Sequence, residues 1–132
     1  MNALDIPDCV VCSLMDARRG EFYQAFFEIK NGTVTRLTED RAVPGDLIAK
    51  ERKAYKNVLL IGDGAEKFSR DYPEFSESLA APEFRYQCGV GAVLLGMKCY
   101  KQGIFTSANK LAPVYLRLPQ AEREFQAKNK DK

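Results

Sequence analysis

The sequence predicts a single α/β (α+β) domain, built from an antiparallel three-stranded meander with a further strand and packing helices. The continuous apolar run Cys9–Met15 is typical of a central strand that is covered on both faces. Glu21–Lys30 alternates with a period of two, which indicates a second strand. Asn31-Gly32 favours a tight hairpin turn because both residues tolerate positive φ, and the β-branched segment Thr33–Thr38 is expected to return as a third strand.

The next part of the chain alternates between helix and strand. A short helix is expected from Leu47 to about Tyr55, with Asp46 as its N-cap. The apolar segment Asn57–Ile61 predicts a buried strand, and a helix follows over residues 65–70. One helical turn is expected over residues 75–79. The resulting order, β-β-β-α-β-α-α, matches the ribonuclease H-like half of an actin-like ATPase fold.

The segment Gln87–Gln102 has the strongest helical pattern. Its small residues recur at steps of three and four, which places them on one stripe. Glycine costs a helix about 1 kcal/mol relative to alanine. We therefore expect another backbone to pack against this stripe and larger side chains to be covered on a second face. The helix would then be enclosed on two sides, by the sheet and by a partner or further lobe. The stripe consists of Gly89, Ala92, Gly96, Cys99 and Gly103.

Three units divide the chain in this interpretation. Residues 1–8 are a leader or linker, residues 9–125 form one ribonuclease H-like lobe, and residues 126–132 are a polar tail. Within the lobe, the proline-bounded segment Ala112–Pro119 is expected to be extended. A polar helix is predicted for Gln120–Lys128.

Composition narrows the functional classes. The 132 residues are 45% hydrophobic and 29% charged, which is typical of a globular domain with one core. No apolar run reaches the length of a membrane span, and the first residues lack a signal peptide's basic start, so a cytoplasmic protein without a membrane partner is expected. The net charge of +2 gives no argument for nucleic-acid binding.

No metal site and no catalytic residue are predicted. The chain contains no histidine, which excludes Ser-His-Asp and Cys-His catalysis within it. Cys9-x-x-Cys12 lies in an apolar run without a second such pair, so these two cysteines are interpreted as small buried residues. Cys88 and Cys99 are expected to be reduced as well.

The segment Asp16-Ala-Arg-Arg-Gly-Glu21 permits two interpretations. It is either a hairpin connection with solvated arginines, or a loop in which Arg18 or Arg19 pairs with a phosphate or a partner's carboxylate. The two can coexist. The neighbouring arginines favour ionised forms of Asp16 and Glu21, which argues against general acid–base catalysis.

Two further motifs have alternative interpretations. Gly62-Asp63-Gly64 is a tight strand-to-helix turn or a weak phosphate-binding signal. Tyr115 and Leu116 fasten the chain over the core while Arg117 pairs locally, or this segment contacts a partner protein or tRNA. Core packing is also preferred over base stacking for the aromatic residues around Tyr23, because the strand offers few cationic side chains.

Three segments together resemble one family. "LMDARRGEFYQAFF" (14–27), "LIGDGA" (60–65) and "APVYLRLPQAERE" (112–124) are similar to the second half of bacterial TsaB, also called YeaZ. The motifs DAR-x-GE-x-Y, which ends at Tyr23, and P-x-YLR, which contains Tyr115 and Arg117, recur in that family in this order. The resemblance covers about residues 8–125. Residues 1–20 do not resemble the "IDTS"-type strand of the family's first lobe, so this chain is expected to correspond to the second lobe alone.

The resemblance implies a specific role. TsaB is a non-catalytic partner of its paralogue TsaD, which transfers a threonylcarbamoyl group to adenosine 37 of tRNA, and the ATPase TsaE joins them. The resemblance therefore implies a scaffold in threonylcarbamoyladenosine synthesis, with a TsaD-like paralogue and a TsaE-like ATPase as partners and tRNA as an indirect one. The family also carries a "glycoprotease" label, but a chain without histidine or a metal site is not expected to be a protease. No intrinsic cofactor is implied, and ATP or ADP is expected only in a full-length complex.

Two alternatives remain open at this point. The chain is also compatible with one lobe of an active actin-like sugar or acid kinase, whose catalytic aspartate would lie in the other lobe. A third hypothesis is a free-standing interaction module that self-associates through the glycine stripe. A homodimer is expected for an isolated lobe because exposed apolar surface favours association.

Overall fold

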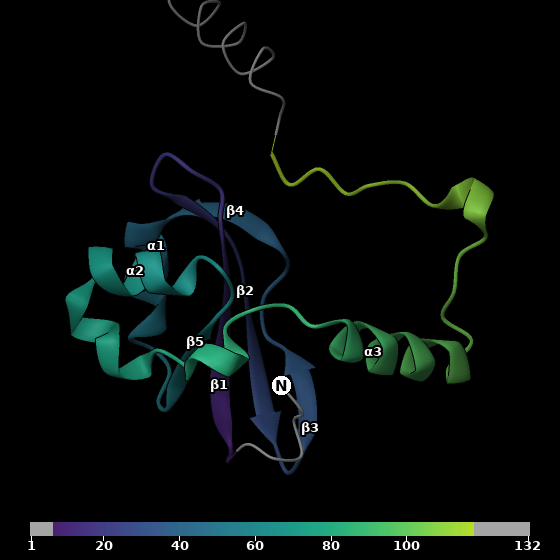
Figure 1. Ribbon diagram of the computed structural model, residues 1–132, viewed down its shortest axis with the longest axis horizontal. Helices are drawn as coiled ribbons and strands as arrows, with labels where there is room; N and C mark the ends of the chain where they lie inside the picture. The colour runs from purple at the N-terminus through teal and green to yellow at the C-terminus, as the bar shows by residue number, and fades with distance from the viewer. Residues whose placement is uncertain (1–6, 118–132) are drawn as a thin grey trace, which may run out of the picture.

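A five-stranded sheet organises the chain in the computed structural model, which describes residues 7–117 (Figure 1). Its main path runs β3-β2-β1-β5, and β4 pairs with β2 as well. The strands are β1 (Cys9–Asp16), β2 (Glu21–Lys30), β3 (Thr33–Arg36), β4 (Arg41–Pro44) and β5 (Val58–Ile61). The mixed α/β class and the mainly antiparallel sheet confirm the predicted fold class.

The hairpin of β1 and β2 forms the centre of the sheet. The antiparallel register runs from Cys9 opposite Ile29 to Asp16 opposite Phe22. The predicted turn to β3 is confirmed, because Asn31 has φ 48° and Gly32 has φ 71°. β5 runs parallel to β1 on its other side, so β1 is central, as the continuous apolar run predicted.

The strand β4 was missed by the sequence analysis. The third strand ends at Arg36, before the predicted Thr38, and the chain then shifts to the opposite end of β2. At the crossing point, the Phe26 amide donates to Thr38 Oγ1 at 2.8 Å, while the Leu37 amide donates to the Phe26 carbonyl at 2.9 Å. The long strand β2 therefore pairs with two short strands, β3 and β4. The four residues of β4, Arg41–Pro44, end in proline and give no strand signal in the sequence.

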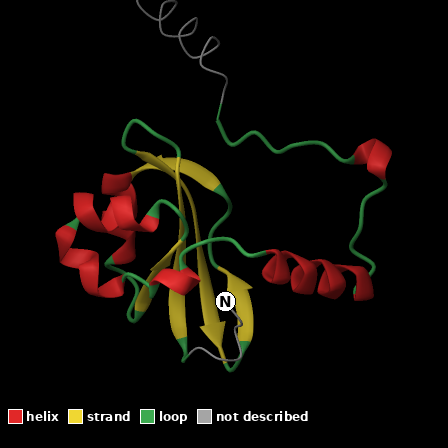
Figure 2. Cartoon of the chain, viewed as in Figure 1, coloured by secondary structure: helices red, strands yellow, loops and turns green. Residues whose placement is uncertain are grey.

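Helices cover one face of this sheet and enclose the core (Figures 1 and 2). They are α1 (Gly45–Arg52), α2 (Ala65–Asp71) and the 3-10 helix η2 (Pro73–Ser78). The ring of Phe68 packs against the rings of Phe22, Tyr72 and Phe75. The core comprises Val10, Cys12, Leu14, Phe22, Phe26, Ile48, Ala49, Val58, Leu60, Ala65, Phe68 and Phe75.

The start of α1 differs from the prediction. The helix begins at Gly45 rather than Leu47, its N-cap is Pro44, and no side chain caps it, so the proposed role of Asp46 as N-cap is wrong. Asp46 lies inside the first turn and accepts a hydrogen bond from the Tyr72 hydroxyl at 2.8 Å. Burial is the main cause and this hydrogen bond the second cause that raise the pKa of Tyr72 to about 12. Gly45 lets the Tyr72 ring lie against the first residue of the helix, where a Cβ would be 2.7 Å from the ring.

The predicted long helix exists, but the predicted packing of this helix on the sheet of the same chain is wrong, and its predicted cover by a partner or further lobe stays a prediction. α3 (Gly89–Lys101) extends away from the sheet and has no buried residue (Figure 1). A Cβ built on Gly89 or Gly96 meets no atom within 4 Å, so nothing in the described structure packs on the small-residue stripe. The short 3-10 helices η3 (Pro82–Phe84) and η4 (Ala108–Lys110) flank it.

The chain then returns toward the sheet in an extended form through residue 117, in line with the prediction for the proline-bounded segment. The predicted helix over 120–128 and the domain boundary at residue 125 lie outside the described residues.

Candidate functional site

The connection between β1 and β2 is a hairpin turn with an unusual backbone. The Ala17 amide donates to the Glu21 carbonyl, and the Glu21 amide donates to the Arg18 carbonyl, both at 3.1 Å. Arg18, Arg19 and Gly20 are all left-handed, with φ values of 63°, 57° and 77°. Each non-glycine residue in this conformation costs about 1–2 kcal/mol, so surrounding contacts have to stabilise the loop.

Two hydrogen bonds supply this stabilisation. The Asp16 carboxylate accepts from the Arg18 amide at 2.8 Å, and the Gly20 carbonyl accepts from the Gly45 amide at 3.0 Å. The turn is therefore fastened to its own strand and to the start of α1. The backbone bonds leave the side chains of Arg18 and Arg19 exposed at the tip. Both interpretations of the segment are compatible with this geometry, because the turn presents two exposed guanidinium groups.

Asp16 connects the turn to α2. Its carboxylate accepts a hydrogen bond from Lys67 Nζ at 2.7 Å, and that ammonium lies 5.2 Å from the centre of the Phe22 ring. The hydrogen bond from Lys67, reinforced by the Arg18 amide, holds the pKa of Asp16 below its ordinary value. An ionised carboxylate of this kind accepts hydrogen bonds and is a poor proton donor.

Glu21 and Arg117 join the two sequence motifs in space. The Arg117 guanidinium pairs with the Glu21 carboxylate, and it also donates to the Ala17 carbonyl at 2.7 Å. Ala17 and Arg117 are 100 positions apart in the chain. Arg117 therefore pairs within its own chain, which is compatible with the interpretation that assigns it no partner protein. Tyr115 does not fasten the chain over the core, because its side chain is 80% exposed.

A hollow of about 260 Å³ lies beside this ion pair. It is lined by Met15, Tyr23 and the returning segment from Val114 to Arg117. Tyr23 and Tyr115 thus belong to one surface with Glu21 and Arg117, on the face of the sheet that α1 and α2 leave open. Of the other predicted site residues, Asp16 contacts Lys67, and Arg18 and Arg19 remain at the loop tip.

Asp63 and its flanking glycines form a structural turn. Gly62 has φ 98°, and a Cβ there would lie 2.0 Å from the Leu14 carbonyl oxygen. The Gly64 amide donates to that carbonyl at 3.0 Å, and the Ala65 amide donates to Gly62 at 3.1 Å. These two amides are engaged within the fold, which favours the tight-turn interpretation over a phosphate cradle. Asp63 itself is exposed.

A polar cluster beneath α1 was not recognised in the sequence. Gln24 is 3% exposed, and its side-chain oxygen accepts from Arg41 at 3.0 and 2.9 Å. Arg41 also pairs with Glu51, so the buried amide is linked to α1. Burial raises the pKa of the adjacent Cys12 thiol to about 12. A glutamine between Phe22 and Phe26 on the inner face of β2 is a signal that could have indicated this cluster.

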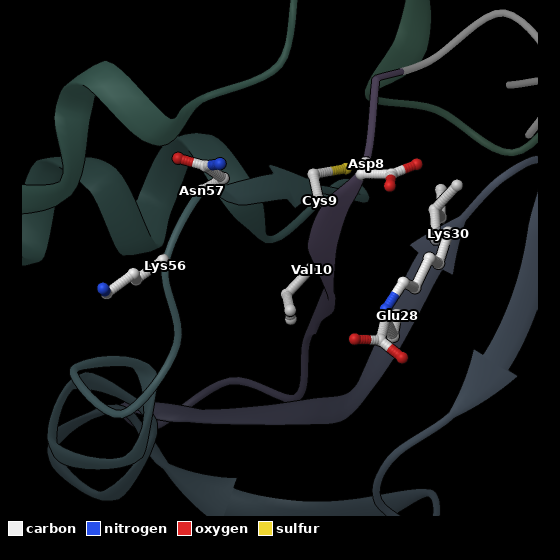
Figure 3. A pocket seen from close by; sticks show the side chains of 8 residues that line it. Asp8, Cys9, Val10, Glu28, Lys30, Lys56 and Asn57 are labelled. Atoms are coloured by element: carbon white, nitrogen blue, oxygen red, sulfur yellow. The ribbon is translucent and has the colours of Figure 1, made fainter.

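A second hollow, of about 270 Å³, lies at the other end of β1 (Figure 3). Asp8, Cys9 and Val10 line one side of it, Glu28 and Lys30 come from β2, and Lys56 and Asn57 precede β5. Burial and the nearby Asp8 carboxylate raise the pKa of the Cys9 thiol. The thiolate form that nucleophilic attack or metal binding needs is therefore disfavoured.

The described part of the chain offers neither a metal site nor a membrane span. Among residues 7–117, no cluster of three or more His, Cys, Asp or Glu side chains is arranged to hold a metal ion. Over the same range, no helix combines the length and the apolar character that crossing a membrane requires.

Comparison with known proteins supports the fold. No protein-family model matches this chain, and no curated protein matches it either. Among solved structures, it is similar to an uncharacterized protein from Pseudomonas aeruginosa that is described as having similarity to peptidase YeaZ, with a TM-score of 0.61 and 18% sequence identity. The match covers 88% of this chain and 56% of that protein, so the chain spans little more than half of its neighbour's length. At this identity the similarity shows a YeaZ-like fold, consistent with the predicted ribonuclease H-like half of an actin-like fold.

Proposed function

We propose that this chain is a TsaB-like scaffold that binds and positions a TsaD-like transferase in the synthesis of threonylcarbamoyladenosine in tRNA. A TsaE-like ATPase is the expected third component, and tRNA is contacted indirectly through the complex. Nucleotide binding is assigned to a full-length complex rather than to this chain.

The contact between Glu21 and Arg117 carries the proposal. The family resemblance rests on two motifs that are distant in sequence, one at the hairpin turn and one near the end of the described chain. In the structure, their charged residues form one ion pair, with a further bond to Ala17. Two unrelated motifs that matched by chance would have no reason to meet, so this contact supports treating them as one functional unit.

A supporting role without chemistry fits the charged groups at this surface. Asp16 is held in its ionised form by Lys67, and Glu21 is paired with Arg117. General acid–base catalysis needs a carboxyl group with a raised pKa in an apolar setting. The carboxylates of Asp16 and Glu21 instead hold the loop on which Arg18 and Arg19 are exposed. This is a structural role in binding and not a catalytic one.

The partner surface is assigned to the loop tip and the adjacent returning segment. Arg18 and Arg19 are exposed on a backbone that hydrogen bonds hold in place, so binding through them loses little conformational freedom. Arginine and tyrosine are the residue types that most often dominate the energy of protein interfaces. Tyr115 lies on the same side and lines one hollow together with Met15 and Tyr23.

Binding to the TsaD-like paralogue encoded in the same genome tests the proposal. Surface plasmon resonance with the 132-residue chain should show saturable binding. Replacing both Arg18 and Arg19 by glutamate should raise the dissociation constant at least tenfold. Lys50→Glu is the matched control, because Lys50 is an exposed cation on α1, away from the loop, and should change binding little.

A second measurement addresses the role in the cell. Deletion of the gene region that encodes this chain should lower the threonylcarbamoyladenosine content of tRNA, measured by mass spectrometry of nucleosides. The proposal is wrong if the chain and any longer protein that contains it fail to bind the paralogue and leave that content unchanged.

A further inference from the structure

An arm, defined as residues 89–116, leaves the sheet and returns to it without being buried. Before the arm, the Gln87 side-chain amide donates to Met15 Sδ at 3.5 Å. After the arm, Arg117 donates to Ala17 and pairs with Glu21. Both ends are thus fastened where β1 meets the hairpin turn. None of the residues between them is buried. Figure 1 shows this segment running away from the sheet and back toward it.

The arm is apolar despite this exposure. Contiguous apolar patches beyond a few hundred Å² are rare on monomers and mark interaction sites. Eleven large apolar side chains of the arm are more than half exposed: Val90, Val93, Leu94, Leu95, Met97, Tyr100, Ile104, Phe105, Leu111, Val114 and Tyr115.

The helix within the arm needs a cover on more than one side. Its only charged residues are Lys98 and Lys101, and large and small apolar residues occupy the rest of its circumference. A helix that is apolar all round is typical of a buried position. A 13-residue helix with three glycines is also marginal by itself, because isolated helices of this length are barely stable in water.

The open face of the sheet, which lies opposite α1 and α2, is a surface of matching character. Its exposed or half-buried apolar residues are Met15, Tyr23, Phe27, Val34, Leu59 and Ile61. Two hollows meet at Met15. One of about 350 Å³ is also lined by Ser13, Ile61 and the residues that lead into α3, and the other is the 260 Å³ hollow beside Tyr23.

We infer that a second copy of this chain covers the arm, so that each copy lays its α3 on the open face of the other copy's sheet. Such an exchange is two-fold symmetric and closed, because the same two surfaces are used twice. An arm that lies between two copies is covered on both sides, which a helix with apolar residues around its circumference requires.

The available area fits a stable dimer. Burying one large apolar side chain is worth about 1.5–3 kcal/mol at about 25 cal/mol per Å², which corresponds to roughly 60–120 Å². The eleven side chains, each more than half exposed, therefore offer on the order of 500–1,000 Å² per copy. Two copies reach about 1,000–2,000 Å², and stable interfaces bury about 1,200–2,000 Å² in total.

Sedimentation equilibrium of the 132-residue chain tests the inference. The unmodified chain should form a dimer at micromolar concentration. Leu94→Glu on the arm and Met15→Glu on the sheet should each raise the dimer dissociation constant at least tenfold. Leu47→Glu is the matched control, because Leu47 is a similarly exposed apolar residue on α1, away from both surfaces. Met97→Glu is a second arm variant should Leu94→Glu fold poorly.

Mixing the two defective chains distinguishes exchange from other modes of association. The Met15→Glu chain keeps an intact arm, and the Leu94→Glu chain keeps an intact open face. A mixture should therefore form a heterodimer through one complete arm-on-sheet contact, although each variant alone is mostly monomeric. Mass photometry with one chain fused to a larger tag would detect this heterodimer.

Two results would overturn the inference. The first is an unmodified chain that stays monomeric even at about 100 micromolar. The second is a mixture of the two variants that stays monomeric. The inference goes beyond the proposed function, because binding of the TsaD-like paralogue is measured separately and through different residues.

Discussion

The packed unit of residues 9–80 and the arm of residues 89–116 use apolar residues in opposite ways. In the packed unit, the inner faces of β1 and β2 meet α1 and α2, and side chains such as Phe26, Phe68 and Leu60 are fully buried. In the arm, residues of the same types stay exposed because no second layer within residues 7–117 faces them. Apolar content alone therefore does not create a core, which needs two surfaces whose periodicities match.

The two regions also use glycine differently. Gly62 and Gly64 lie where the backbone of β1 leaves no space for a side chain, since a Cβ on either would contact that strand at less than 3 Å. Gly89 and Gly96 have open space around them. In the packed unit, glycine is thus required by contacts within the chain, whereas no contact within residues 7–117 requires glycine at positions 89 and 96.

The largest contrast is expected from removing one aromatic ring in each region. Phe68→Ala should lower the free energy of unfolding by about 3–5 kcal/mol, because the ring fills the centre of the aromatic cluster. Phe105→Ala should change it by less than about 0.5 kcal/mol. Urea denaturation followed by circular dichroism measures both, at concentrations where the chain is monomeric. Equal effects would show that the arm belongs to the packed unit.

Replacing a glycine sharpens the same contrast. Gly62→Ala should destabilise the chain by more than about 2 kcal/mol, because φ is 98° and the new methyl group would meet the Leu14 carbonyl. Gly96→Ala should leave the unfolding midpoint of the packed unit unchanged and raise the helix content slightly. Thermal denaturation is the measurement, and tolerance of alanine at Gly62 would contradict the described turn.

The ion pair that fastens the arm should contribute a smaller amount. A double-mutant cycle with Glu21→Gln and Arg117→Met should give a coupling energy of about 1 kcal/mol, since the pair is only partly exposed. The matched cycle on Arg36 and Asp40, which are far more exposed, should give less than about 0.5 kcal/mol. Loss of the first pair should also speed proteolysis within the arm. A coupling energy near zero would mean that the arm's end is not held.

The smallest effect concerns pH. Because the folded-state pKa of Asp16 lies below its ordinary value of 3.8, its contact with Lys67 stabilises the fold above that pH and is lost as pH falls through the lowered pKa. Asp16→Asn should therefore cost less than about 1 kcal/mol at neutral pH and nothing in strong acid. Denaturation at several pH values measures this, with Asp63→Asn as the exposed control. A pH-independent cost would assign the effect to the turn rather than to the charge.

Local patterns in the sequence predicted most of the packed unit. The continuous run of β1, the alternation of β2 and the Asn31-Gly32 turn each depend on neighbours along the chain, and each was confirmed. β4 was missed because it depends on a long strand pairing with two partners. Asp46 was assigned the wrong role because its hydrogen-bond partner, the Tyr72 hydroxyl, is 26 positions away in the chain and leaves no local signal.

The surface could be predicted only in part. The family resemblance singled out both Glu21 and Arg117, but only the fold shows that they pair. The helical pattern of α3 was recognised, whereas its lack of a cover within the described chain was not. Periodicity tells which residues need a neighbour and leaves open whether that neighbour belongs to the same molecule.

Two cysteines differ in exposure in the same way as the packed unit and the arm. Cys12 is fully buried and its thiol has a pKa of about 12, while Cys88 is exposed at the start of α3. A thiol-reactive dye should therefore label Cys88 at once and Cys12 only when the core opens. The rate of labelling at Cys12 therefore reports how often the sheet unfolds, and the native chain needs no introduced probe for this measurement.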